Sequence, residues 1–178
     1  MSKTFPPLPR LVGGEPILTF LIGLPATGKS TFLTKKLDRC VSKYHIASTD
    51  DILERYAQED GTTYDAVWNT RFKEAETEFR EGIMLAARAG IDIYVDRTNV
   101  FASARRKVML WVESSTKVAY KRIGVVFPTP EDAILKERLR NREELTGKHV
   151  PWDAIETMRE NMVDPSHGEF HVVRAPPN

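Results

Sequence analysis

The chain has 178 residues, of which 41% are hydrophobic and 29% are charged, and its formal net charge is +1. These values are typical of one soluble globular domain, and they exclude a broad basic coat for nonspecific nucleic-acid binding while allowing a local basic groove. Cys40 is the only cysteine, which excludes an intramolecular disulfide. The sequence has no apolar run of membrane-spanning length and no signal-peptide core, so we expect a cytoplasmic enzyme without a membrane partner.

Proline and glycine dominate residues 1–16, which are predicted to form a flexible N-terminal arm before one domain at 17–178. Within the arm, residues 6–10 have the composition of a polyproline docking ligand, although a simple lead-in to the first strand is the favoured interpretation. The apolar run 17–22 contains two β-branched isoleucines and predicts a buried parallel strand.

A phosphate-binding loop follows this strand. Residues 23–30, Gly-Leu-Pro-Ala-Thr-Gly-Lys-Ser, match the P-loop pattern G-x-x-x-x-G-K-[ST] without a mismatch. The pattern lies between the predicted strand and a segment of helical spacing at 31–37, where its mechanism requires it. Gly23 and Gly28 let the backbone turn tightly and approach phosphate closely, and the N–H groups at the helix N-terminus add positive potential. An ordinary glycine-rich turn is the alternative.

Two side chains of the loop have specific expected roles. Lys29 supplies a mobile cation for the β- and γ-phosphates of an NTP, and Ser30 supplies a hydroxyl for Mg²⁺. The residues predicted to bind the nucleotide are Gly23, Leu24, Pro25, Ala26, Thr27, Gly28, Lys29, Ser30 and Thr31.

A second strand is predicted at 44–48, and Asp50 and Asp51 follow it. In open α/β sheets, ligands bind beyond the carboxyl ends of strands, so these carboxylates are well placed for chemistry on a bound phosphate. We interpret Asp50 as the group that does chemistry and Asp51 as a partner of the helix dipole. The alternative is that Thr49 or Asp50 caps a helix that begins near Ile52.

The segment 63–89 predicts a long helix that ends at Gly90. Apolar and aromatic residues recur along it at three- and four-residue steps and are interpreted as one buried stripe. The stripe consists of Trp68, Phe72, Ala75, Phe79, Ile83 and Ala86.

A third strand at 91–95 is followed by Asp96, at the place where P-loop enzymes carry an acid that supports Mg²⁺. A turn-capping aspartate is the alternative. The next predicted helix, 102–115, begins with the basic triplet 105–107, which is interpreted as solvated surface or, at the rim of an active site, as a contact for an anionic substrate.

An arginine-dense helix is predicted at about 131–145, after a fourth strand at 118–127. With the glycine-containing loop 146–149, it is interpreted as a lid, whose guanidinium groups neutralise charge on a transferred phosphoryl group. A surface helix with ordinary ion pairs is the alternative. The lid arginines are Arg138, Arg140 and Arg142.

A helix at about 151–162 and a strand at 170–173 complete the pattern. The alternation of strands and helices predicts an α/β fold. We therefore expect a P-loop NTPase with a five-stranded, mainly parallel sheet, helices on both faces and an arginine-rich lid.

Several of these motifs, taken together, resemble the 5′-hydroxyl polynucleotide kinase family, a group of P-loop NTPases found in phage and in animal end-healing enzymes. The matching segments are 23–31, Thr-Asp-Asp at 49–51, Asp-Arg-Thr-Asn at 96–99, 138–142, 147–151 and, in the tail, Pro165 with Gly-Glu-Phe at 168–170. The resemblance covers nearly the whole chain from residue 17, and this ordered set is much more specific than the P-loop alone.

The resemblance implies Mg²⁺-dependent transfer of the γ-phosphate of ATP or another NTP to the 5′-OH end of DNA or RNA in end healing. A ligase is the implied partner, and the host cytoplasm is the implied location for a phage-encoded enzyme. Asp50 would accept the proton of the attacking hydroxyl, Lys29 would hold the donor, and Arg140 or Arg142 would be the lid arginine. The implied metal ligands are Ser30 and Asp96. The implied substrate contacts are Asp50, Arg55, Asp96, Arg97 and Asn99.

The sequence departs from the family pattern at one position. Phage members carry an arginine for an acceptor phosphate three residues after the catalytic aspartate, where this chain has Leu53 and where Arg55 is nearby without being equivalent. The chain also lacks the Asp-x-Asp-x-Thr motif of the phosphatase domain of bifunctional relatives, so a stand-alone kinase is expected.

Two other functions fit the same motifs. One is a P-loop kinase of a small metabolite or nucleoside, which would not need an acceptor groove that follows a strand. The other is a nucleotide-binding switch or scaffold that transfers no phosphate. The candidates for an acceptor groove are Arg55, Arg97, Arg105, Arg106 and Trp152.

Overall fold

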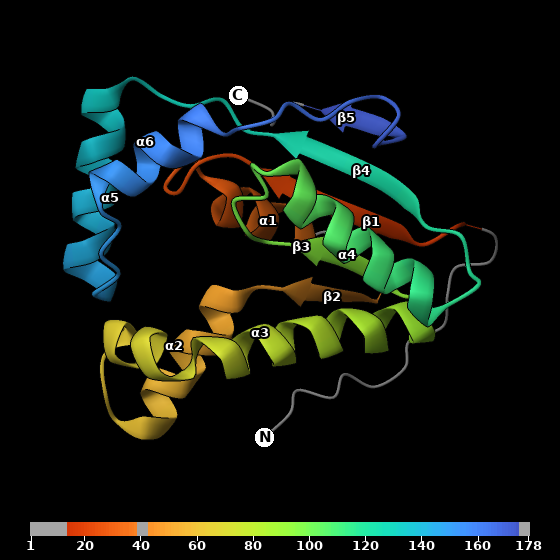
Figure 1. Ribbon diagram of the computed structural model, residues 1–178, viewed down its shortest axis with the longest axis horizontal. Coiled ribbons are helices and arrows are strands. Elements are labelled where there is room, and N and C mark those ends of the chain that lie inside the picture. The colour runs from red at the N-terminus through yellow and green to blue at the C-terminus, as the bar shows by residue number, and fades with distance from the viewer. Residues whose placement is uncertain (1–13, 39–42, 175–178) are drawn as a thin grey trace.

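The computed structural model describes residues 14–38 and 43–174. Five strands form one sheet in the order β2-β3-β1-β4-β5, and all the pairings are parallel (Figure 1). This confirms the α/β fold and the five strands predicted from the sequence. The strands are β1 (Ile17–Ile22), β2 (Tyr44–Ala47), β3 (Asp92–Val95), β4 (Lys121–Val126) and β5 (Val172–Arg174).

The central strand, β1, pairs with β3 on one side and with β4 on the other. All of its residues except Ile17 are buried, as an apolar run without alternation requires when both faces of a strand are covered. Because the strands are parallel, their carboxyl ends share one edge of the sheet, at the left in Figure 1. The segments that leave this edge carry the P-loop, Asp50 and Asp96.

Helices cover both faces of the sheet, as predicted. They are α1 (Lys29–Leu37), α2 (Thr49–Asp60), α3 (Tyr64–Ala89), α4 (Ala102–Ser115), α5 (Asp132–Thr146) and α6 (Trp152–Glu160). On one face, Phe79 of α3 and Val108 of α4 belong to a buried cluster with Phe20 of β1. On the other face, Leu33 of α1 packs in a second cluster with Val125 of β4.

The start of α2 differs from the prediction. The helix begins at Thr49 rather than near Ile52, because Ser48 is its N-cap and the Ser48 hydroxyl accepts a hydrogen bond from the Asp51 N–H at 3.1 Å. The alternative in which Thr49 or Asp50 caps the helix is therefore wrong. Asp50 lies in the first turn, and its carboxylate is available for other contacts.

Helices α5 and α6 pack onto the P-loop itself. Leu135 and Leu139 of α5 and Ile155 of α6 are buried in one cluster with Leu24 of the P-loop and Val100. In Figure 1, α5 and α6 lie at the end of the molecule toward which the strands point. This apolar contact holds the base of the arginine-rich helix beside the loop that is predicted to bind phosphate.

Trp68 does not belong to the buried stripe of α3, contrary to the prediction. Its surface is 43% exposed, whereas Phe79 and Ile83 farther along the helix are fully covered by the sheet and α4. The difference arises because the first turns of α3 extend beyond the carboxyl edge of the sheet and pack against α2 instead (Figure 1). An apolar stripe of constant spacing is therefore core over one part of the helix and surface over another.

Arg105 is buried, so its interpretation as solvated surface or as a substrate contact is wrong. Its guanidinium donates to both carboxylate oxygens of Glu169, at 2.6 and 2.9 Å. It also donates to the carbonyls of Asn99 at 2.9 Å and Val163 at 3.0 Å. The next residue, Arg106, is exposed as predicted. Arg105 therefore joins α4, the loop after β3 and the C-terminal segment.

Some predictions concern residues outside the described ranges. These are most of the N-terminal arm, the polyproline interpretation of residues 6–10, and Cys40. Within the described ranges, none of the helices combines the length and the apolar character needed to cross a bilayer.

Candidate active site at the carboxyl edge of the sheet

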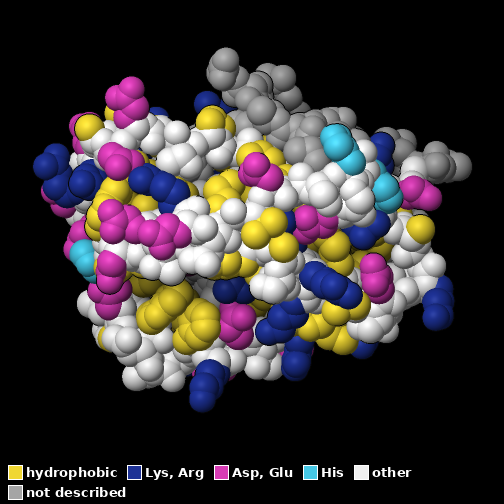
Figure 2. Space-filling view, turned by 45° about the horizontal axis from the view of Figure 1, so that its top comes forward, with side chains coloured by type: hydrophobic (Ala, Val, Ile, Leu, Met, Phe, Trp, Pro, Cys, Tyr) yellow, Lys and Arg dark blue, Asp and Glu magenta, His cyan; other side chains and the backbone are white. Residues whose placement is uncertain are grey.

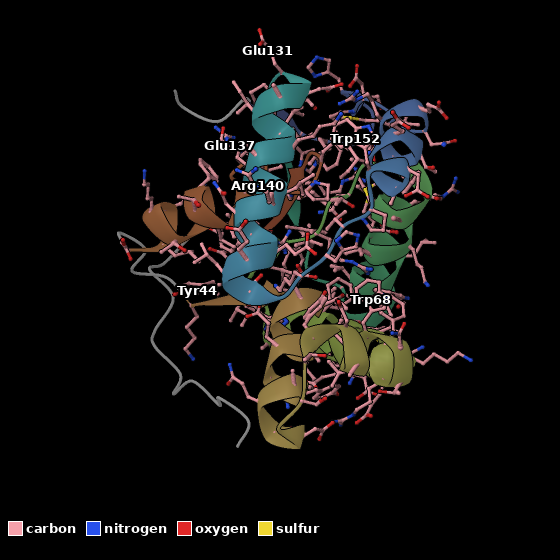
Figure 3. All side chains as sticks on the ribbon, turned by 90° about the vertical axis from the view of Figure 1, so that its left-hand side faces the viewer. Tyr44, Trp68, Glu131, Glu137, Arg140 and Trp152 are labelled. Carbon is pink, nitrogen blue, oxygen red and sulfur yellow. The ribbon has the colours of Figure 1, made fainter. Side chains whose placement is uncertain are left out.

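A cavity of about 2020 Å³ opens at the carboxyl edge of the sheet. Residues of the P-loop, the start of α2, the start of α3, the end of α5 and the loop 146–151 line it. Figure 3 looks at this end of the molecule, with α5 and α6 above and α2 and α3 below. Ligand sites for drug-sized molecules occupy about 300–1,000 Å³, so the cavity has room for more than one such molecule.

The P-loop has the backbone geometry that its glycines permit. Gly28 has a φ of 92°, in the left-handed region, and precedes the first turn of α1. At Gly23, a Cβ would lie 3.0 Å from the Cβ of Phe127 and 3.0 Å from the Thr27 hydroxyl, so a side chain there would require these neighbours to shift. The Gly23 N–H donates to the carbonyl of Thr98 at 2.9 Å, which ties the P-loop to the loop after β3.

Lys29 lies inside the P-loop. Its side-chain nitrogen donates to the carbonyls of Gly23 at 3.0 Å and Leu24 at 2.7 Å. Burial lowers the pKa of Lys29 to about 8, although the nearby Asp96 carboxylate opposes this shift. The ammonium group is thus held where the loop is predicted to take phosphate, with part of its charge uncompensated by the surrounding protein.

Ser30 and Asp96 fit the predicted metal site. The Ser30 hydroxyl donates to Asp96 Oδ2 at 2.8 Å, which brings two hard oxygen ligands together beside the P-loop. Burial raises the pKa of Asp96, and the charges of Asp51 and Asp50 add to this effect. A divalent cation at this place would offset that concentration of negative charge.

Asp50 is the centre of a network of hydrogen bonds in the cavity. Its Oδ1 accepts from the Tyr64 hydroxyl at 2.9 Å, and its Oδ2 accepts from Arg142 at 2.7 Å and from Lys148 at 3.4 Å. Burial alone would raise the pKa of Asp50, but the charges of Lys148 and Arg142 and the Tyr64 hydrogen bond outweigh it and hold the pKa below its ordinary value. The carboxylate is therefore ionised at neutral pH.

Lys148 is a site residue that the sequence did not single out. Its side chain is 7% exposed, and its ammonium pairs with Glu54 as well as with Asp50. Lys148 lies in the loop 146–149 of the predicted lid and in the matching segment 147–151, but neither pattern assigned a role to its side chain. The turn at Gly147, whose φ is 68°, ends α5 and directs the following residue into the cavity.

The structure distinguishes the two candidate lid arginines. Arg142 lines the cavity and contacts Asp50, whereas the side chain of Arg140 is 69% exposed and pairs only weakly with Glu144, at 3.8 Å. Arg138 also lines the cavity, and its Nη1 lies 3.5 Å from the carbonyl of Ala26 in the P-loop. Of the two, Arg142 is the residue placed to act at the site.

Replacing Arg142 by Ala is expected to lower kcat for phosphoryl transfer by about 10²- to 10³-fold, because one cationic donor aimed at the reacting group is lost. Arg140→Ala is the matched control on the same helix and should leave kcat unchanged. The measurement is steady-state transfer from labelled ATP at saturating acceptor. Equal losses in the two variants would contradict the assignment of Arg142.

The remaining predicted substrate contacts lie in different environments. Arg97 lines the cavity and pairs with Glu76 at 2.9 Å. Asn99 is buried, and its amide donates to the carbonyls of Leu21 at 2.9 Å and Val95 at 3.0 Å. The structure therefore contradicts the implied substrate contact of Asn99, because this side chain holds the loop after β3 against β1.

Arg55 and Leu53 are also outside the cavity lining. Arg55 pairs with Glu59 at 3.1 Å and with Glu78, on the outer side of α2 and α3. Leu53 is buried in a cluster with Tyr56 and other residues of α2 and α3. Neither side chain is placed to contact an acceptor, and the implied contact of Arg55 is not supported by its position.

The other groove candidates do not line the cavity either. Arg105 is buried, and the indole N–H of Trp152 donates to Glu156 at 2.9 Å. On the face shown in Figure 2, Lys and Arg side chains are interspersed with Asp and Glu. A continuous basic track is not visible on this face.

Comparison with known sequences places these features in a family context. The AAA_33 family, described as an AAA domain, matches residues 18–165. Heterogeneous nuclear ribonucleoprotein U-like protein 2 of Mus musculus is 26% identical over 155 residues, or 84% of this chain, and the Homo sapiens protein of that name is similar to the same extent. The chain spans 20% of the length of these relatives.

Three solved structures share the fold. A chain of the Pnkp1/Rnl/Hen1 RNA repair complex has a TM-score of 0.65 at 20% identity, over 85% of this chain and 45% of that one. A kinase candidate from Chloroflexus aurantiacus has a TM-score of 0.65 at 19% identity, over 90% and 84% of the two chains. A gluconokinase from Sinorhizobium meliloti has a TM-score of 0.51 at 18% identity, over 92% and 85%.

At these identities the likeness extends to the fold alone. The architecture is an α/β P-loop kinase fold with a parallel sheet and helices on both faces. Structures named for RNA repair and for gluconate phosphorylation share it, so the fold does not select the acceptor.

Proposed function

Because the chain belongs to the AAA domain family AAA_33 and has a P-loop kinase fold, we propose that it transfers the γ-phosphate of ATP or another NTP to the 5′-hydroxyl of a DNA or RNA strand. The observation that carries the proposal is the position of Asp50. Its ionised carboxylate lies in the same cavity as the P-loop, with Arg142 in direct contact.

The chemistry follows from these positions. The 5′-hydroxyl of the acceptor donates to Asp50, which orients the oxygen and accepts its proton as the oxygen bonds to the γ-phosphorus. The bond from that phosphorus to the bridging oxygen breaks, and the nucleoside diphosphate leaves. Lys29 and Arg142 neutralise the charge on the phosphate oxygens during the transfer.

Mg²⁺ fits the site as a cofactor. The hydroxyl of Ser30 and the carboxylate of Asp96, 2.8 Å apart, would hold it. A bound Mg²⁺ supplies charge neutralisation of the donor phosphates. Asp96 belongs to the loop after β3. Asn99 fastens this loop to the sheet through its hydrogen bonds to the carbonyls of Leu21 and Val95.

Two features support a polynucleotide acceptor. The motifs of the P-loop, of residues 49–51 and of the lid resemble those of 5′-hydroxyl polynucleotide kinases, and the cavity is larger than an NTP requires. The names of a matched relative, a ribonucleoprotein, and of a matched structure, an RNA repair complex, fit the same acceptor class. A ligase that consumes the new 5′-phosphate fits as a partner of such a kinase.

The second candidate is a kinase of a small metabolite or nucleoside. The fold shared with a gluconokinase favours it, and so do the acidic residues Asp51, Glu54 and Asp65 in the cavity wall, which repel a polyanion. A nucleoside or a sugar carries no phosphate and would meet no such repulsion.

Incubation with Mg²⁺, γ-labelled ATP and a short 5′-hydroxyl oligonucleotide tests the proposal, beside the same oligonucleotide carrying a 5′-phosphate. Label is expected only on the 5′-hydroxyl strand. Parallel reactions contain nucleosides and gluconate as acceptors. Transfer to one of these and to none of the DNA or RNA strands would replace the proposal by the second candidate.

A further inference from the structure

An exposed aromatic ring forms part of the cavity wall where α2 and α3 begin. Trp68 is 43% exposed, in a helix whose other large aromatic residues are buried or half-buried. Tyr64, Glu54 and Asp50 line the same cavity. Figure 3 labels Trp68 on α3 and Trp152 on α6 above it. Trp68 lies at the site, and the chemistry described above does not use it.

The ring belongs to an ordered row. Tyr64, Trp68 and Phe72 are four residues apart on α3, so their side chains share one face. The ring centroids of Tyr64 and Trp68 are 5.9 Å apart, and those of Trp68 and Phe72 are 4.6 Å apart. Tyr64 and Phe72 pack against the buried cluster that contains Leu53, so both ends of the row are held and Trp68 is supported between them.

This row leads directly to the carboxylate at the centre of the site. The Tyr64 hydroxyl donates to Asp50 Oδ1 at 2.9 Å. A group lying on Trp68 is therefore separated from Asp50 by the length of one tyrosine side chain. An acceptor whose hydroxyl reaches Asp50 from the α2–α3 side passes this row.

The charges around this part of the cavity do not favour phosphate contacts. Lys148 and Arg142 pair with Asp50, Lys148 pairs also with Glu54, and Arg97 pairs with Glu76. Arg55, the only basic residue in α2, pairs with carboxylates outside the cavity lining. Recognition of an acceptor here has to rely on something other than its phosphates.

The donor nucleotide has a different place to lie. Along the carboxyl edge, the sheet order puts Asp50 after β2, Asp96 after β3, the P-loop after β1, and residues 127–130 after β4. Residues 127–130 and Arg138 line the cavity beyond the P-loop, on the side away from β2. With its γ-phosphate toward Asp96, the nucleoside of the donor extends to this side and leaves the α2–α3 side to the acceptor.

We propose that Trp68, supported by Tyr64, is the stacking platform for the terminal nucleobase of the acceptor, which places the 5′-hydroxyl of that nucleotide at Asp50. The inference rests on the proposed function. Stacking on an aromatic ring suits such an acceptor because every base has a π-face, so the enzyme takes ends of any sequence. It also replaces the phosphate contact that the buried Leu53 cannot make.

The test compares Trp68→Ala, Trp68→Phe and, as a matched control on an exposed position of the same helix, Leu85→Ala. Each variant is assayed with an oligonucleotide whose 5′-terminal nucleotide is intact and with one that is abasic there. Trp68→Ala is expected to raise KM for the intact acceptor between about 5-fold and about 100-fold, with kcat and KM for ATP little changed. Trp68→Phe should keep most of the affinity. For the abasic acceptor, KM should be the same for the wild type and for Trp68→Ala.

Three results would overturn the inference. An equal rise in KM for intact and abasic acceptors would show that Trp68 does not contact the base. A rise in KM for ATP instead would assign the ring to the donor nucleoside. Both of these leave the kinase activity standing. Absence of transfer to any oligonucleotide by the wild-type protein would overturn the proposed function and this inference together. Thermal unfolding of each variant identifies a folding defect.

Discussion

Asp50→Asn is expected to lower kcat for phosphoryl transfer by about 10²- to 10⁴-fold while leaving nucleotide affinity nearly unchanged. The asparagine keeps the shape of the side chain and can still accept from Tyr64, which now bonds to Oδ1 at 2.9 Å. It carries no charge, however, and cannot accept the proton of the attacking hydroxyl. The measurement is single-turnover transfer to a 5′-hydroxyl oligonucleotide, together with a direct titration of ATP.

The neighbouring carboxylate provides the control. Asp51 also lines the cavity, where partial desolvation raises the pKa of its carboxyl, in contrast to the lowered pKa of Asp50. Asp51→Asn should therefore change kcat by less than about 10-fold. An unchanged kcat in Asp50→Asn would remove Asp50 from the chemistry, and a large loss of ATP affinity in that variant would assign it to the donor side.

Arg105→Ala is expected to reduce the free energy of unfolding by about 3–5 kcal/mol, because it leaves Glu169 without its buried partner. The Arg105 side chain is fully buried and the Glu169 side chain is 18% exposed, so water compensates the carboxylate only in part. Three backbone carbonyls, of Asn99, Val100 and Val163, also lose a donor. For a protein whose total stability is of the order of 5–15 kcal/mol, this is a large fraction.

Denaturant unfolding monitored by circular dichroism measures this effect, with Arg106→Ala as the matched control. Arg106 is exposed on the same helix, and its removal should change the stability by no more than about 0.5 kcal/mol. We also expect Arg105→Ala to weaken ATP binding, since the loop after β3 bonds to the P-loop through Thr98 and Gly23. Equal stability of the two variants would mean that the pair with Glu169 contributes nothing net.

Local patterns were sufficient to predict the framework of the site. The P-loop motif needs only eight consecutive positions, 23–30, and the apolar run before it predicts a parallel strand, because both signals are properties of neighbouring residues. The parallel sheet then brings the segments after β1, β2 and β3 to one edge, which is why Asp50 and Asp96 could be placed beside the P-loop.

Contacts between distant segments decided the roles of individual charged and aromatic side chains. Arg140 and Arg142 are two residues apart on one helix, so they point to different faces, but only the packing of α5 against the P-loop cluster determines that Arg142 faces Asp50. Arg105 and Arg106 differ in the same way, because Glu169, 64 residues away, meets one and not the other.

The sequence by itself therefore determined the fold class, the phosphate-binding loop and the edge of the sheet at which the site lies. The tertiary structure alone decided that Trp68 is exposed, that Lys148 is buried beside Asp50 and that the Asn99 amide donates to a backbone carbonyl of β1. The physical reason is range: periodicity and loop motifs describe interactions within a few residues, whereas burial and ion pairing depend on which remote element covers a given face.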